Sequence, residues 1–550
     1  MKIHHFPNYE TSLLFLIHSI PFIDKSPFLS IEFNCLSCQS LLNLYLGVNI
    51  MNAENKKIIE HFDVLIIGAG ISGIGAGCHL TMKSPDISYA ILEGRDAIGG
   101  TWDLFKYPGI RSDSDLYTFG YSFKPWIEDN PLAAGDVICK YLKETTEDYG
   151  VDKKIRFGHH ISKAVWSSEK RHWTLDITVQ ESGKTKHMTC GFLFSCTGYY
   201  NYEKGYLPEF KDYDSFKGTI AHPQLWPENL DYKDKNIVVI GSGATAVTIV
   251  PAMAGVAHHV TMLQRSPSYI LSRPGVDKFA AWLHSWLPSK LAYGINRVRY
   301  VCLALFLYTT SRRKPEKMRA YLMDEAQKAT GPNIDANIHF NPSYKPWDQR
   351  LCMVPDEDLF HHLRDGSASI ITDHIDCFTE KGIKLVSGAE VEADIIIPAT
   401  GLALQFMGGI EVWVDDKRIN GGDLINYKGM MFSNVPNMVA TFGYTNASWT
   451  LKADLTADYV ARLLNYMKKH NYDVVVPALD NATIGEIPMV ELNSGYVKRG
   501  MDIMPKQGPE RPWLNKPNYI SDLMAIKFTS FDDDVLKFSK ATSPVKEHID

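Results

Sequence analysis

The chain has 550 residues, of which 45% are hydrophobic and 22% are charged. These fractions are ordinary for folded proteins, so global disorder is excluded, and the length excludes a single small binding module. Lys and Arg number 57 against 63 Asp and Glu, a formal net charge of −6, and this balance argues against a nucleic-acid partner.

Residues 1–50 precede the first recognisable element. Their apolar run over 12–23 is interrupted by His18 and Pro21 and is shorter than the ~20 residues of a membrane span, so no integral span is predicted. Met51 then opens a polar leader. We predict that the native protein starts at Met51 and that 1–50 is an extension, disordered or not native, outside the folded enzyme.

Nine cysteines are scattered along the chain. An odd, scattered set fits a reducing compartment better than a disulfide scaffold, so a cytoplasmic protein is predicted. The one close pair, Cys35 and Cys38, has no second pair or histidines nearby at ligand spacing. No metal site is predicted.

The first nucleotide-binding pattern begins with an apolar run over 62–67, typical of a strand buried on both faces of a parallel sheet. Gly68, Gly70 and Gly73 follow in G-x-G-x-x-G spacing and lead into a helix-compatible segment. A second strand over 89–92 ends at Glu93, 20 residues after Gly73, where an acid can accept hydrogen bonds from a ribose. Strand, glycines, helix and acid together predict a dinucleotide site.

A second pattern of the same kind lies over 236–266. The strand over 236–240 runs into Gly241, Gly243 and Ala246, and the next strand ends in Arg265 and Ser266 instead of an acid. An arginine can pair with a 2′-phosphate that a carboxylate would repel, so this site is predicted to take NADP rather than NAD. An ordinary surface charge is the alternative reading of Arg265.

The two patterns predict an α/β protein with two Rossmann-like dinucleotide-binding domains. The strands over 192–198 and 393–401 both end in Thr-Gly and mark points where the chain crosses between domains. We therefore predict a discontinuous FAD domain over 58–200 and 391–550 and an inserted NADP domain over 201–390. Residues 278–330 are helix-like, and we expect them to form a lid or wall of the substrate pocket. Peripheral membrane contact by this segment is the alternative.

Two fingerprints indicate the class of flavoprotein. Residues 216–227 fit F-x-G-x-x-x-H-x-x-x-W-P at every fixed position, and residues 99–113 fit [A/G]-G-x-W-x-x-x-x-[F/Y]-P-[G/M]-x-x-x-D. Both resemble the fingerprints of type I Baeyer–Villiger monooxygenases, which insert one atom of dioxygen. Residues 344–352 and 444–454 are similar to the branch of that family formed by the ethionamide-activating monooxygenases.

The resemblance implies two sets of cofactor contacts. FAD would touch Ser72, Glu93, Thr101, Trp102, Asp103, Leu104, Asp113 and the main chain near Ile161. NADP would touch Arg111, Ser112, Asp113, the loop of Gly241, Ser242, Gly243, Ala244, Thr245 and Ala246, and also Arg265 and Ser266.

Arg350 matches the arginine that sits against the flavin in this family. A flavin peroxide anion needs a permanent cation beside it, and a guanidinium does not lose its proton near neutral pH. Asp113 would hold this arginine through a paired hydrogen bond. The alternative for Arg350 is a structural ion pair. His222, in the first fingerprint, is not predicted to be a general base.

By resemblance, the enzyme would oxidise NADPH and use dioxygen through a C4a-peroxyflavin. Its substrates would be ketones, converted to esters, or sulfides and thioamides, oxygenated on sulfur. A flavin N- or S-monooxygenase or a long-chain alkane hydroxylase without ketone activity is the alternative. A pyridine-nucleotide:disulfide reductase would need a CxxC beside the flavin, and the only CxxC precedes the FAD domain. A non-catalytic nucleotide-binding regulator would lack flavin colour and turnover.

Overall fold

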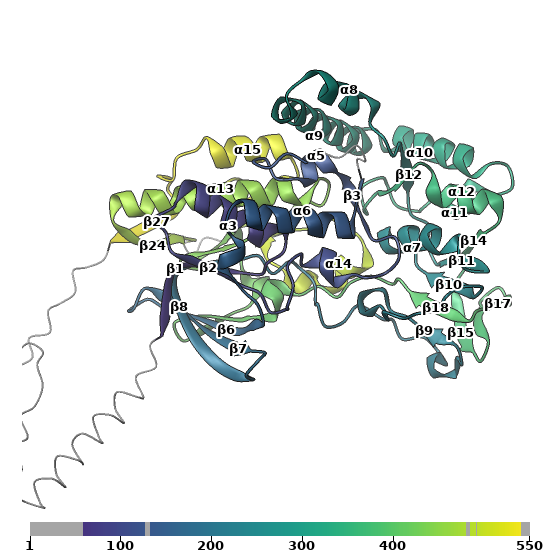
Figure 1. Cartoon of the computed structure of the whole chain (residues 1–550), viewed down its shortest axis with the longest axis horizontal. Coiled ribbons are helices and arrows are strands. Elements are labelled where there is room, and N and C mark those ends of the chain that lie inside the picture. The colour runs from purple at the N-terminus through teal and green to yellow at the C-terminus, as the bar shows by residue number, and fades with distance from the viewer. Residues whose placement is uncertain (1–58, 127–131, 480–483, 491, 541–550) are drawn as a thin grey trace, which may run out of the picture. The chain divides into compact units, whose positions relative to one another are not determined.

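A computed structural model of the chain describes residues 59–126, 132–479, 484–490 and 492–540. The residues from Glu60 onward form one compact unit, shown in Figure 1. The predictions on residues 1–50, including a start at Met51, and on the pair Cys35 and Cys38 lie outside the described residues. Among the helices described, none combines the length and apolar character that crossing a bilayer requires.

A nine-stranded sheet holds the first nucleotide-binding pattern. Its strand β1 (Glu60–Ile67) pairs in parallel with β2 (Tyr89–Leu92) on one side and β8 (Lys184–Ser195) on the other. From edge to edge, the strands are β20 (Lys417–Ile419), β19 (Glu411–Val414), β6 (His159–Ser167), β7 (His172–Val179), β8, β1, β2 and β5 (Ile155–Arg156), and β23 (Met438–Ala440) also pairs with β8.

Both faces of this sheet are covered, which explains why the second half of β1, residues 64–67, is apolar without alternation. Val64 and Ile66 pack into a core with helices α3 (Ile71–Lys83) and α13 (Trp449–His470). Leu65 and Ile67 point the other way, into a core shared with the β6–β7 hairpin. Because α13 lies against α3, the C-terminal part of the chain completes the first domain, as Figure 1 shows.

A five-stranded parallel sheet holds the second pattern. It runs in the order β14 (Ala368–Thr372), β11 (His259–Gln264), β10 (Asn236–Ile240), β18 (Ile395–Pro398) and β9 (Thr219–Ile220). As in the first sheet, the opening strand lies between the strand that follows it and one that comes much later. Helices α7 (Ala244–Ala254) and α12 (Asp358–Asp365) pack together on this sheet. The predicted α/β fold with two Rossmann-like sheets is confirmed.

The predicted return to the first domain at residue 391 is wrong. β18 lies in the second sheet, with Ile397 beside Val239 of β10, so the chain returns only after Pro398. The strands ending near 198 and 401 carry the same apolar run before Thr-Gly, and that pattern does not say which sheet receives each strand. The first strand after the crossing that joins the first sheet is β19, which pairs with β6.

The two crossings between the sheets run side by side. Asn201 donates its N–H to the carbonyl of Ala403 at 2.8 Å, and Gln405 donates to the carbonyl of Tyr199 at 3.0 Å. Tyr200 and Leu404 form an antiparallel bridge between these bonds. The outgoing and returning chains therefore form one short two-stranded ribbon.

The segment predicted as helical over 278–330 is helical. It contains α8 (Lys278–Trp286), α9 (Ser289–Arg313) and α10 (Pro315–Thr330), with α8 and α9 at the top of Figure 1. Arg297 of α9 donates to the carbonyls of Tyr117 and Gly120 at 2.8 and 2.7 Å and to Asp454 at 3.3 Å. These bonds fix α9 against the first domain.

Short elements complete the fold. The helices are α4 (Thr101–Leu104), α5 (Leu116–Phe119), α6 (Gly135–Asp148), α11 (Ala336–His339), α14 (Gly495–Arg499) and α15 (Tyr519–Lys527). The small sheets pair β3 (Arg111–Asp115) with β4 (Leu132–Ala134), β12 (Ile270–Arg273) with β13 (Cys352–Pro355), β15 (Ile375–Thr379) with β16 (Gly382–Leu385) and β17 (Glu390–Glu392), β21 (Asn426–Tyr427) with β22 (Met431–Phe432), β24 (Tyr472–Pro477) with β27 (Leu536–Lys540), and β25 (Ile487–Pro488) with β26 (Lys506–Gln507).

Candidate active site

The first glycine loop fits a dinucleotide pyrophosphate. Gly68 has a φ of +98°, and a Cβ on Gly73 would lie 1.8 Å from the Gly68 carbonyl oxygen, so neither position tolerates a side chain. Gly70 begins α3 without a side-chain cap, and the first turn contains no acid. The N–H groups at the start of α3 are therefore not claimed by a side-chain cap, and the helix dipole favours an anion there.

Glu93 lies at the end of β2, as the sequence predicts, and its carboxylate is fixed by the main chain. It accepts hydrogen bonds from the N–H of Ala69 at 2.7 Å and of Arg95 at 2.9 Å. A carboxylate offers about four acceptor positions, so acceptor capacity remains for a ribose. The N–H of His159 donates to the Glu93 carbonyl at 2.8 Å, which brings the strand carrying Ile161 alongside.

The other residues expected to contact FAD are positioned by aromatic and charged neighbours. Ser72 accepts a hydrogen bond from the indole of Trp449 at 2.8 Å, and Thr101 accepts one from the hydroxyl of Tyr200 at 2.7 Å. Asp103 of α4 binds Arg95 at 2.6 Å, and the Trp102 ring packs edge-on against Phe119. Leu104 ends the same short helix.

The second glycine loop leaves an anion site open. Gly241 has a φ of +147°, and Gly243 begins α7 with no side-chain cap and with no atom within 4 Å of an added Cβ. Ser242 donates its hydroxyl to the carbonyl of Ser266 at 2.8 Å, which ties the loop to the end of β11. Ala244, Thr245 and Ala246 form the first turn of α7. Arg265 is exposed beside this loop, and no acid within the described ranges pairs with it.

Arg111 and Ser112 lie on β3. Arg111 donates to Asp358 of α12 at 2.6 Å, a bond that joins the first domain to the second. Its second terminal nitrogen, Nη2, is buried without a protein partner. A buried guanidinium N–H without an acceptor is costly, so this nitrogen fits a ligand oxygen. The Ser112 hydroxyl instead accepts from the N–H of Ser114 at 3.0 Å.

Asp113 and Arg350 form the charged centre of the site. The guanidinium donates from Nε to Asp113 Oδ2 at 2.7 Å and from Nη2 to Oδ1 at 2.5 Å, a paired hydrogen bond of the kind predicted. The Asp113 carboxylate raises the pKa of Arg350 above its ordinary value. With 42% of its side chain exposed, Arg350 keeps donors free while remaining fixed.

This pair lines a cavity of about 650 Å³. The part of the wall that α9 forms is largely apolar, because this helix contributes Val301, Ala304, Leu305 and Leu307. A volume of this size suits a small organic molecule. The helical segment therefore forms a wall of the cavity.

Polar groups of the cavity are mostly bound to one another. Asp277 accepts from the Tyr300 hydroxyl and from Arg299, both at 2.6 Å. Arg273, from the end of β12, also lines the cavity, and its Nε is buried without a protein partner. The apolar surface consequently dominates what a substrate would meet.

Similarity to known proteins shows the family of the chain. The flavin-binding monooxygenase-like family matches residues 62–284. The FAD-containing monooxygenase EthA of Mycobacterium tuberculosis is 50% identical over 487 residues, which cover 88% of this chain and 99% of EthA. The chain belongs to the FAD-containing monooxygenases. The probable FAD-binding monooxygenase AlmA of Acinetobacter baylyi is 48% identical over 489 residues, 88% of this chain and 98% of AlmA.

The fold of this FAD-containing monooxygenase also resembles that of a steroid monooxygenase solved in its oxidised form with NADP. The TM-score is 0.68 at 20% identity, over 88% of this chain and 100% of that one. The predicted family, monooxygenase class and flavin cofactor are therefore confirmed. The individual residue roles stay predictions.

Several residues that shape the site of this monooxygenase were not predicted. Trp449 and Tyr200 hold Ser72 and Thr101, and the only available signal for Trp449 was its place in the similar stretch over 444–454. Nothing in the sequence indicates the bond between Asp277 and Tyr300, because Asp277 caps α8 and Tyr300 lies in α9. His222 packs against Gly205, where an added Cβ would meet its ring at 2.1 Å. His222 does not line the cavity.

Proposed function

We propose that this monooxygenase uses NADPH and dioxygen to insert an oxygen atom into a ketone, giving an ester, or to transfer it to the sulfur of a sulfide or thioamide. The observation that carries the proposal is the fixed Arg350 cation on the wall of an apolar cavity. When bound, NADPH supplies a hydride, and FAD accepts it and activates dioxygen.

Arg350 would stabilise negative charge on the reacting oxygen atoms. Its guanidinium stays protonated at every working pH, because the neighbouring carboxylate raises its pKa further. Asp113 uses two of the guanidinium N–H groups and leaves the others free to donate. A charge oriented in advance stabilises a transition state without reorganisation during the reaction.

The two glycine loops would hold the cofactors. Gly68, Gly70 and Gly73 with the start of α3 suit the FAD pyrophosphate, and Glu93 suits its ribose. Gly243 with the start of α7 suits the NADPH pyrophosphate. The exposed, unpaired Arg265 would bind the 2′-phosphate that distinguishes NADPH from NADH.

The cavity favours uncharged, apolar substrates. The aliphatic side chains of its α9 wall offer no partner to a charged group, and the polar residues that α9 adds, Arg299 and Tyr300, are already bonded to Asp277. Exclusion of water by this wall would also protect a reactive intermediate from side reactions with water. Small ketones and sulfides therefore fit better than amines, whose positive charge Arg350 and Arg273 would repel.

We infer a reducing, cytoplasmic location from the cysteines. Cys78, Cys139, Cys190, Cys196, Cys302, Cys352 and Cys377, the seven within the described ranges, all carry free thiols. Thiols persist in a reducing compartment. Alkylation of intact cells with a thiol reagent, followed by mass measurement of the protein, tests this location.

A product analysis tests the reaction. Purified protein is incubated with NADPH and ¹⁸O₂ and, in parallel, with a methyl ketone, a thioether and a long alkane. We expect products heavier by one ¹⁸O atom from the ketone or the thioether. Label only in the alkane would select the hydroxylase alternative, and hydrogen peroxide alone would contradict oxygen transfer. In the same assay Arg350→Ala should lose most of the product, whereas the matched control Arg418→Ala, which breaks the exposed 2.9 Å pair with Glu411, should retain it.

A further inference from the structure

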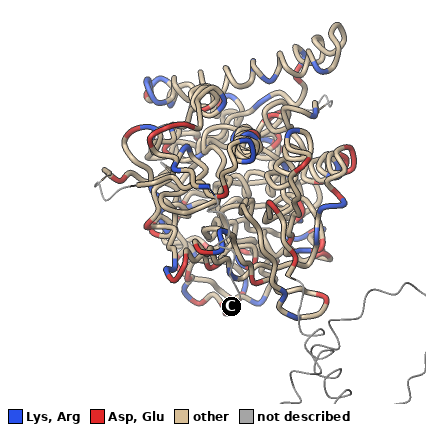
Figure 2. Tube along the Cα trace, turned by 90° about the vertical axis from the view of Figure 1, so that its left-hand side faces the viewer, with Lys and Arg blue, Asp and Glu red and all other residues tan. Residues whose placement is uncertain are grey.

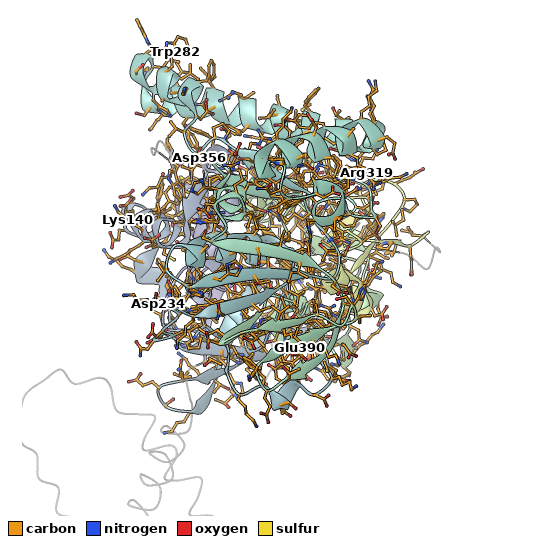
Figure 3. The ribbon with its side chains drawn as sticks, turned by 90° about the vertical axis from the view of Figure 1, so that its right-hand side faces the viewer. Lys140, Asp234, Trp282, Arg319, Asp356 and Glu390 are labelled. Atoms are coloured by element: carbon orange, nitrogen blue, oxygen red, sulfur yellow. The ribbon has the colours of Figure 1, made fainter. Side chains whose placement is uncertain are left out.

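The outer face of α8 and α9 is unusually apolar. On α9, Leu291, Ile295, Val298, Cys302 and Phe306 recur every three or four residues, and all are exposed. On α8, Trp282 and Trp286 are 54% and 76% exposed. Figure 3 shows Trp282 at the outer edge of the molecule. We call this surface, Trp282, Trp286, Leu291, Ile295, Val298, Cys302 and Phe306, the outer stripe.

The outer stripe is not the side of α9 that packs against the protein. Ala292, Tyr293, Asn296 and Val301 are buried on the inner side. The helix is therefore apolar on two sides, although only one is covered by protein. A helix with apolar residues all round is normally buried, so the exposed side calls for another apolar medium.

The charge on these helices is equally one-sided. Residues 278–314 contain seven basic residues and no acidic one, in a chain whose formal net charge is −6. Three of the seven form ion pairs within the protein: Arg297 with Asp454, Arg299 with Asp277, and Arg312 with Asp348. Lys290, Arg313 and Lys314 are exposed, and no acid in the described ranges pairs with them. Figure 2 shows blue basic segments on the topmost helices.

We propose that the outer stripe docks on an anionic lipid surface. Exposed tryptophans and aliphatic side chains beside lysines and arginines are the composition of helices that lie in the plane of a membrane interface. The indoles would lie at headgroup depth, the aliphatic stripe would enter the acyl boundary, and the free bases would pair with anionic headgroups. A protein partner would instead need acidic side chains around an apolar groove.

The cavity opens beside this surface. Val276 and Phe279 line the cavity and are also 54% and 44% exposed, and Phe279 lies one turn of α8 before Trp282. Docking would therefore bring the mouth of the cavity to the lipid. Delivery of lipid-dissolved substrates would follow, and that consequence, unlike docking itself, rests on the proposed function.

Vesicle flotation tests the docking without turnover. The full chain is mixed with vesicles of phosphatidylglycerol and phosphatidylcholine in equal amounts, or of phosphatidylcholine alone. We expect binding to the anionic vesicles and at least tenfold weaker binding to the neutral ones. Brominated acyl chains should quench part of the tryptophan emission, because Trp282 and Trp286 enter the bilayer.

Two variants and one control locate the binding surface. The first variant combines Trp282→Ala, Trp286→Ala and Phe306→Ala, and it should abolish flotation. The second combines Lys290→Glu, Arg313→Glu and Lys314→Glu. At roughly fivefold per basic charge lost, it should weaken binding to anionic vesicles by at least about a hundredfold. Phe157→Ala with Val386→Ala removes exposed apolar side chains elsewhere and should change nothing. Flavin content and thermal melting confirm that each variant is folded.

Three outcomes would overturn the proposal. The full chain could fail to bind anionic vesicles, or the tryptophan variant could bind as well as the unchanged protein. The unchanged protein could instead form dimers that the tryptophan variant loses in light scattering, which would make the stripe a protein interface. Because none of these measurements uses NADPH or substrate, their failure is distinct from a failure of the proposed reaction.

Discussion

Asp113 and Arg350 lie 237 residues apart and share two hydrogen bonds of 2.7 and 2.5 Å. Asp113 comes from β3 of the first domain, and Arg350 precedes β13, close to the second. The pair joins the two domains at the cavity. In the proposed reaction, we expect the two residues to act as one unit.

A double-mutant cycle tests that unity. Arg350→Ala should lower product formation about 10²- to 10³-fold, as loss of a preorganised charge does elsewhere, while bound flavin is retained. If Asp113 acts through Arg350, adding Asp113→Ala should cost little more than Arg350→Ala alone. Product per NADPH consumed is the measurement. Multiplicative losses would show that Asp113 acts separately.

Arg265 should decide the choice of nicotinamide. A charge-assisted hydrogen bond contributes about 1.5–3 kcal/mol, so Arg265→Ala should raise KM for NADPH about tenfold or more. KM for NADH should stay unchanged, since NADH has no 2′-phosphate. Steady-state oxidation of both nucleotides measures the effect, with the exposed Lys233→Ala as control. An equal rise for both nucleotides would contradict the assignment.

The ion pairs of Glu60 should make a pH-dependent contribution to the stability of the fold. Hydrogen bonds from Arg156, and from Lys186, lower the pKa of Glu60 from 4.5 to about 2. Because the folded-state pKa is depressed, the stabilisation is present above about pH 4.5 and is lost as the pH falls toward 2. The side chain is 39% exposed, so screening keeps the contribution below about 1 kcal/mol.

Urea unfolding of Glu60→Gln against the unchanged protein measures that contribution. The difference in unfolding free energy should be largest at neutral pH and shrink below pH 4.5. Glu392→Gln, at an exposed carboxylate, is the control and should give a small difference. A difference that grows on acidification would refute the sign.

Gly73 and Gly255 form a matched pair of glycines. Gly73→Ala places a Cβ 1.8 Å from a backbone oxygen that cannot move away, so we expect lost flavin and destabilisation by more than about 2 kcal/mol. Gly255 has a φ of −79° and open space around it, and Gly255→Ala should stabilise by about 0.4–1 kcal/mol. Flavin absorbance and the melting temperature report both effects. Normal flavin content in Gly73→Ala would contradict the packing argument.

The features that sequence could predict are those encoded by neighbouring residues. The run from β1 through Gly68 and Gly73 to Glu93 was predictable because strand, turn, helix and acid follow in order. The bond between Asp113 and Arg350 was predicted only from the family resemblance, because the spacing of the two residues in the sequence does not indicate a contact. The prediction of a domain boundary at 391 was wrong because two similar strands enter different sheets. Which sheet a strand joins depends on pairing partners far along the chain.

The helical segment shows the same limit. Its helices were predictable from composition, whereas the contacts that hold it were not. Arg297 bonds Asp454, 157 residues away in the sequence, and Tyr300 of α9 bonds Asp277, the residue that caps α8. Such contacts arise only when tertiary packing brings separate elements together.

The paired crossings at Tyr200 and Leu404 restrict how the two domains can move. If each crossing were a separate tether, one domain could slide past the other. Because the two are hydrogen-bonded into a single ribbon, we expect them to flex together, at Asn201 and Ala403. In any rotation about this ribbon, residues far from it would travel the longest arcs, while residues next to it would stay nearly still.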